Sequence, residues 1–76
     1  MELDILHRVT LLGILKKRPE ESLEDVMKIL IDTGMYEQAE AKKVFADLRA
    51  SGHIVSEGLS FIGVDAAQKA EQEFKQ

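Results

Sequence analysis

The sequence predicts a mainly α-helical fold with a small β-hairpin, and three observations indicate this class. Apolar residues recur every three to four positions over residues 4–51, which is the spacing that places them on one side of a helix. The pattern then changes around Glu57-Gly58, where two short apolar runs flank a turn that contains glycine. Helical spacing returns near Asp65. The expected order is therefore three helices, a hairpin and a fourth helix, in a single domain over residues 1–76.

The first helix is expected from about Asp4 to Lys17. Ile5, Val9 and Leu12 form an apolar stripe at helical spacing. Pro19 ends the pattern because it cannot continue a helix. Further apolar residues fall away from this stripe, namely Leu3, Leu11 and Ile14. A helix that is apolar on more than one side is either central in the fold or shared with a second subunit.

The second and third helices have recognisable ends. Ser22 can cap the second helix, with Asp25 at the reciprocal position of a capping box, and Gly34 is placed to end it in a left-handed conformation. The third helix is expected over residues 37–51, followed by Gly52. Its apolar face comprises Ala41, Val44, Phe45 and Leu48.

The hairpin is expected to pair Ile54 with Phe61 across Glu57-Gly58. The last helix then begins near Asp65 or earlier, with Asp65 or Ser60 as its cap. All three phenylalanines, Phe45, Phe61 and Phe74, are expected in the core. Tyr36 is expected to bury its ring and keep its hydroxyl in water.

Two local patterns resemble a known family. Leu48-Arg49-Ala50-Ser51-Gly52-His53-Ile54 is similar to the junction between recognition helix and wing in MarR-type and PadR-type regulators. Leu59-Ser60-Phe61-Ile62-Gly63, followed by Ala67, is similar to the Leu-Thr-x-x-Gly stretch that leaves the wing. With the turn at Gly34-Met35-Tyr36, the order over residues 5–74 resembles the winged-helix form of the helix-turn-helix domain. The resemblance implies a three-helix core, a two-stranded wing and a C-terminal helix.

The resemblance further implies a DNA-binding transcriptional regulator in which residues 37–51 form the recognition helix. On that template, the DNA-contacting side chains are Gln38, Lys42, Lys43 and Arg49. Lysine and glutamine are also ordinary residues of a solvated helix, so this alternative stays open. A homodimer would double the phosphate contacts of one module. Its candidate interface comprises Leu3, Leu11 and Ile14 of the first helix, with Phe74 of the last helix as a second possibility.

The charge distribution supports a different hypothesis. The net charge is −4, and residues 20–41 hold seven acidic residues against one basic residue. A protein-interaction module that does not bind DNA is therefore the alternative, with a partner surface at Glu20, Glu21, Glu24 and Asp25. Acids that begin helices also favour the helix dipole by themselves. A basic strip joining Arg8, Lys16, Lys42, Lys43 and Arg49 would favour DNA, whereas an acidic entrance to the third helix would favour protein.

Other functional classes find little support in the sequence. It contains no cysteine, and His7 and His53 lack the spacing of metal ligands, so no metal site or cofactor is expected. We expect His7 on a helix surface and His53 at the helix–strand junction. Ser51, His53 and Asp47 are sequence neighbours without an oxyanion motif, so no catalytic residues and no enzyme are expected. The apolar runs are too short to span a membrane, and the N-terminus lacks a signal pattern, which predicts a cytoplasmic protein.

Overall fold

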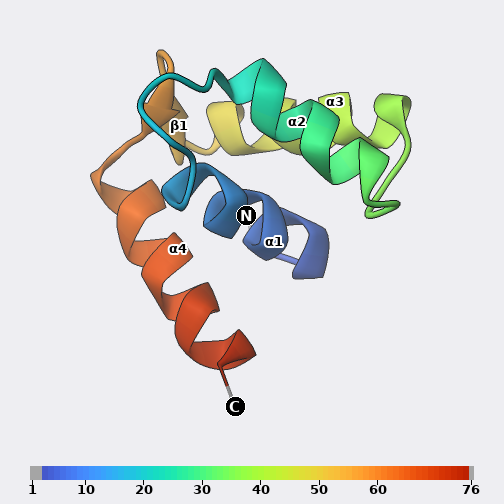
Figure 1. The fold of residues 1–76 in the computed structure, drawn as a ribbon. Coiled ribbons are helices and arrows are strands. Elements are labelled where there is room, and N and C mark those ends of the chain that lie inside the picture. The colour runs from blue at the N-terminus through green and yellow to red at the C-terminus, as the bar shows by residue number, and fades with distance from the viewer. Residues whose placement is uncertain (1–2, 76) are drawn as a thin grey trace.

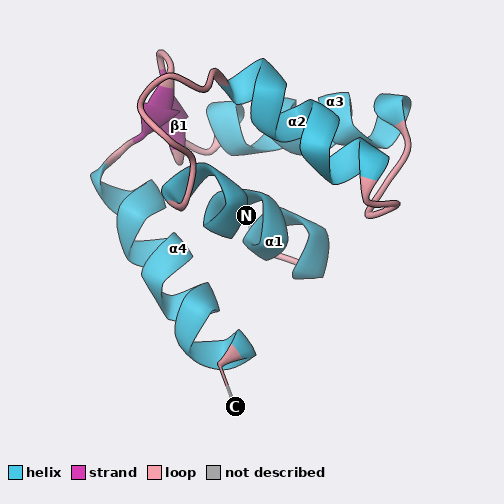
Figure 2. Ribbon diagram, viewed as in Figure 1, coloured by secondary structure: helices cyan, strands magenta, loops and turns pink. Residues whose placement is uncertain are grey.

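The computed structural model describes residues 3–75 and has the expected order of elements (Figure 1). Three helices come first, α1 (Ile5–Leu15), α2 (Leu23–Asp32) and α3 (Gln38–Ala50). An antiparallel hairpin of β1 (Ile54–Val55) and β2 (Gly58–Leu59) follows, and α4 (Phe61–Phe74) ends the described chain. Figure 2 shows that these residues are mainly helical, with the hairpin at one end. The predicted fold class is confirmed.

Helix α1 lies at the centre of the fold and packs against α2, α3, α4 and β2. Its buried side carries Leu11, which is 0% exposed, and Ile14. The predicted stripe of Ile5, Val9 and Leu12 is the less buried side of the helix, because Ile5 is 56% exposed while Val9 and Leu12 are half-buried. Both sides of this helix are apolar, so periodicity alone did not indicate which side α2 and α3 would cover.

This position of α1 corrects the predicted dimer interface. Leu11 and Ile14 lie inside the monomer, so they cannot contact a second subunit, and their placement in an interface was wrong. Leu3 is half-buried and packs against the same core. Phe74 is exposed at the end of α4, contrary to its predicted place in the core.

The helix ends follow the local signals of the sequence. Ser22 and Asp25 form the predicted capping box at the start of α2. Gly34 and Gly52 both have positive φ, +84° and +82°, as predicted for residues that end α2 and α3. At α1 the cap is Asp4, whose carboxylate accepts a hydrogen bond from the His7 backbone N–H.

The hairpin register differs from the prediction. Ile54 pairs with Leu59 and Val55 pairs with Gly58, so the turn is Ser56-Glu57. Phe61 is not a strand residue because α4 already begins there, with the Ser60 hydroxyl accepting from the Gly63 N–H. As the first residue of α4, Phe61 is 92% exposed, and its predicted place in the core was wrong. Only Phe45 of the three phenylalanines is buried.

A buried hydrogen bond joins α1 to the segment before α3. The Tyr36 ring is buried as predicted, but its hydroxyl lies 2.9 Å from Thr10 Oγ1 inside the protein and not in water. Burial raises the pKa of Tyr36, and the hydrogen bond with Thr10 opposes that rise. This pair fixes the start of α3 relative to α1.

Candidate nucleic-acid interface

The outer side of α3 is exposed to solvent. Ala41, Val44, Phe45 and Leu48 are buried and turn the helix toward α1, α2 and β1. The opposite side is therefore exposed, and it carries Gln38, Ala39, Lys42, Lys43 and Ala46. Three of the four residues predicted to contact DNA, Gln38, Lys42 and Lys43, thus lie together on one uncovered surface. Its alanines leave room for close approach by another molecule.

Lys43 belongs to a polar network that crosses from α3 to α1. Its Nζ donates to Asp47 Oδ2 at 3.2 Å, and the same carboxylate oxygen lies 3.2 Å from His7 Nε2. The hydrogen bond from Lys43, followed by the one with His7, holds the pKa of Asp47 below its ordinary value of 3.8. His7 Nδ1 lies 2.7 Å from Asp4 Oδ1, so both ring nitrogens face carboxylates.

The position of His7 overturns its predicted place on a helix surface, since its side chain is buried. One signal for this was present in the sequence: an Asp–x–x–His pattern at the start of a helix can form a capping box, and Asp4 and His7 do so. The contact between His7 and Asp47 could not be predicted from a local pattern in the sequence, because the two residues are 40 positions apart. His53 does lie between α3 and β1, as predicted.

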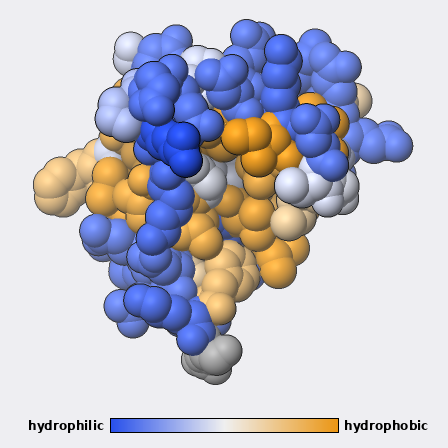
Figure 3. Space-filling model, in the orientation of Figure 1, coloured by the Kyte–Doolittle hydropathy of each residue, from blue (hydrophilic) through white to orange (hydrophobic). Residues whose placement is uncertain are grey.

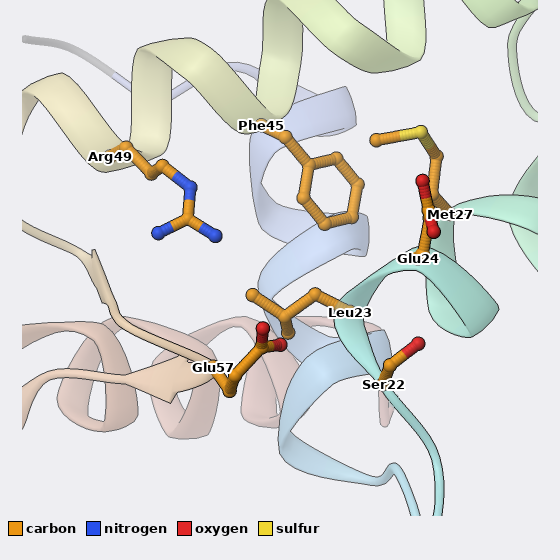
Figure 4. Close-up of a pocket in the computed structure, with 7 residues that line it drawn as sticks. All are labelled: Ser22, Leu23, Glu24, Met27, Phe45, Arg49 and Glu57. Carbon is orange, nitrogen blue, oxygen red and sulfur yellow. The ribbon is translucent and has the colours of Figure 1, made fainter.

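Arg49, the fourth predicted DNA contact, is exposed but points toward the hairpin. Its Nη1 donates to the Ser56 carbonyl at 3.0 Å, which braces the turn of the hairpin against α3. A hollow of about 380 Å³ lies between α2, α3 and the turn. Figure 4 shows Arg49 at its edge. Phe45 and Leu23 line this hollow together with the carboxylates of Glu24 and Glu57. Arg49 therefore stands in acidic surroundings.

Arg8 and Lys16, the other members of the expected basic strip, are engaged elsewhere. Arg8 Nη1 donates to Glu73 Oε2 at 3.0 Å, and Lys16 pairs with Glu71, so both basic residues hold α4 on α1. The hydrogen bond from Lys16 lowers the pKa of Glu71. The basic residues that remain on α3 are Lys42, Lys43 and Arg49.

Acidic side chains surround the start of α3 and of α2. Glu37, the N-cap of α3, and Glu40 in its first turn are both exposed. At α2, Glu21 accepts from the Arg18 backbone N–H at 2.8 Å, and Asp25 accepts from the Ser22 N–H at 2.9 Å. These two carboxylates stabilise local structure. Glu20 and Glu24 are the exposed members of the predicted acidic surface that make no such cap.

Comparisons with protein-family models, with curated proteins and with solved structures find no match to this chain. Over residues 3–75, no group of three or more histidine and carboxylate side chains is placed to hold a metal ion. Over the same part of the chain, every helix is too short or too polar to cross a bilayer.

Proposed function

We propose that this chain is a winged-helix protein that binds duplex DNA through α3 and regulates transcription in the cytoplasm. The observation that carries the proposal is the uncovered side of α3, where Gln38, Lys42 and Lys43 stand among alanines. A helix of this kind can enter the major groove, because small side chains permit close approach while lysines reach phosphates at the sides. The hairpin stands beside this helix as a wing does, with Arg49 linking the two.

Only a few basic residues support binding, so the interaction should be weak and sensitive to salt. Lys42, Lys43 and Arg49 are the basic residues of α3. Each neutralised phosphate adds about 0.9 to the slope of log affinity against log salt. Three such contacts would therefore lower affinity about 40-fold between about 50 and 200 mM salt. The acids at Glu37 and Glu57 weaken the attraction further because they stand at the helix entrance and the wing turn.

The test is a fluorescence anisotropy titration of the protein into labelled random duplex DNA at these two salt concentrations. Binding at the lower salt that falls by about 40-fold at the higher salt supports the proposal. Absence of binding at about 50 mM salt would overturn it, because phosphate contacts are strongest under that condition.

Lys43 and Lys69 provide a matched pair for locating the site. Both are exposed, at 75% and 76%, and each pairs with an aspartate one turn away, at 3.2 and 3.1 Å. Lys43→Ala and Lys69→Ala therefore remove the same charge and the same kind of ion pair, but only Lys43 lies on α3. We expect Lys43→Ala to reduce the salt dependence from about 40-fold to about 12-fold and Lys69→Ala to leave it near 40-fold. If the two changes altered the salt dependence of DNA affinity equally, α3 would not be the DNA-binding element.

The second candidate is a protein-interaction module with the same fold. Exposed carboxylates at the starts of α2 and α3, together with the engagement of Arg8 and Lys16 by α4, favour it. Its surface is best tested at Glu20 and Glu24, because Glu21 and Asp25 also cap local structure. A partner captured by the wild-type protein should be lost by Glu20→Lys and Glu24→Lys together. Retention of that partner would count against the acidic surface.

A further inference from the structure

An apolar band crosses the side of α1 that faces away from α2 and α3. Ile5 is 56% exposed there, and Val9 and Leu12 on the same side of the helix are half-buried. Figure 3 shows hydrophobic side chains gathered across the middle of this face, over α1 and the adjoining part of α4. A patch of this kind on a small protein commonly marks an interaction surface.

The neighbouring helices extend this surface. The ion pair between Arg8 and Glu73 brings the last turn of α4 beside the first turns of α1, so exposed Phe74 lies next to the band. On the other side, Ile29 of α2 lines a shallow hollow of about 160 Å³ together with Gly13 and Lys16. Ile29 is about half exposed. We define the α1 band as the five residues Ile5, Val9, Leu12, Ile29 and Phe74.

We propose that the α1 band binds the α1 band of a second copy of this chain, with the two α1 helices antiparallel. The charges at the ends of the helix fit this arrangement. Asp4 stands exposed at its start, whereas Lys17 and Arg18 follow its end. A two-fold axis near the middle of α1 places the acidic start of each helix beside the basic end of the other. It also sets the two helix dipoles in opposite directions, which is favourable.

The area of the band suits a dimer that dissociates readily. From their exposures, the five side chains offer roughly 400 Å² of apolar surface per copy, or about 800 Å² for two copies. Because about 60% of a typical interface is apolar, the whole contact would bury about 1,300 Å². This lies at the lower end of specific interfaces. We therefore expect association in the micromolar range, independent of any DNA.

Sedimentation velocity of the full chain, from about 5 to 500 µM, tests the proposal. The wild-type protein should change from monomer to dimer over this range. Ile5→Lys should weaken association at least about tenfold, because it removes apolar surface from the band and places a positive charge beside the basic end of the partner's α1. The change should not disturb folding, since Ile5 is the first residue of α1 and its side chain is exposed. Circular dichroism checks that the variant is folded.

Phe61→Lys is the control, because Phe61 is the first residue of α4, is 92% exposed and lies outside the band. It should leave association unchanged. A wild-type monomer at every concentration would overturn the proposal, as would a dimer that is lost in Phe61→Lys and kept in Ile5→Lys. The orientation is tested with single cysteines, since the chain has none of its own. Val9→Cys lies near the middle of α1 and should form an intermolecular disulfide faster than Ile5→Cys, because an antiparallel arrangement brings the two copies of Val9 together and separates the two copies of Ile5. Equal rates would contradict the antiparallel arrangement.

Discussion

Replacing Gly63 with alanine should destabilise the protein, although the same change usually stabilises a helix. Gly63 lies in the first turn of α4, where the helix passes over the chain between α3 and β1. A Cβ atom there would lie 2.1 Å from the His53 carbonyl oxygen and 3.2 Å from Leu59 Cδ2. The first atom is backbone, so rotation of a side chain cannot relieve the clash. Helix α4 must instead move away from the hairpin by more than 1 Å, which is about the shortfall from an ordinary contact.

That movement should lower the free energy of unfolding by a measurable amount. The His53 carbonyl accepts from the Ser60 backbone N–H at 3.0 Å and from the Ser60 hydroxyl, and both bonds would lengthen. Overpacking in a well-filled site costs about 1–3 kcal/mol, and each weakened hydrogen bond costs about 1 kcal/mol more. These costs exceed the gain of about 1 kcal/mol from replacing glycine by alanine in a helix. We expect a net loss of about 2 kcal/mol, which lowers the Tm by about 10 °C in a domain of this size.

Urea unfolding followed by circular dichroism measures this loss, and Gly58→Ala is the matched control. A Cβ atom at Gly58 would meet no atom within 4 Å, so that variant should stay within about 0.5 kcal/mol of the wild type. A Gly63→Ala protein as stable as the wild type, or more stable, would refute the close packing of α4 on the hairpin.

Two further predictions concern the polar contacts of α1. Tyr36→Phe should cost about 1–2 kcal/mol in urea unfolding, because it leaves the fully buried Thr10 hydroxyl without its partner; no loss would contradict the buried pair. Asp47→Asn should destabilise the protein at pH 6, because it removes a carboxylate bound by Lys43 and His7. The folded pKa of Asp47 is lowered, so its stabilisation is complete above the ordinary aspartate pKa of 3.8 and is lost as the pH falls through the folded pKa. Unfolding at several pH values should show the variant and the wild type converging below about pH 4, and a constant difference would contradict the prediction.

Local signals in the sequence predicted much of the fold because their physical basis is local. Ser22 and Asp25 cap a helix start through hydrogen bonds three residues apart. Gly34 and Gly52 adopt a left-handed conformation that other residues avoid. The exposed side of α3, with Gln38, Lys42 and Lys43, followed from a single apolar face on that helix.

The prediction at the hairpin failed because two signals overlap in a few residues. Phe61 has the aromatic character of a strand residue, and the sequence predicted it opposite Ile54. The Ser60 hydroxyl instead binds the Gly63 N–H and starts α4 at Phe61, so the ladder ends at Leu59. Capping competes with strand pairing at this point, and the propensity of one residue does not decide between them.

The sequence by itself determined the order of the elements, the caps at Ser22 and Gly34, and the basic residues available to α3. The tertiary structure decided how the two apolar sides of α1 are used. It buried Leu11 and Ile14 in the core and left Ile5 exposed. It also joined His7 to Asp47 across 40 positions and committed Arg8 and Lys16 to α4. The physical reason is that periodicity reports which residues share a face of one helix, whereas burial and ion pairing depend on which other elements cover that face.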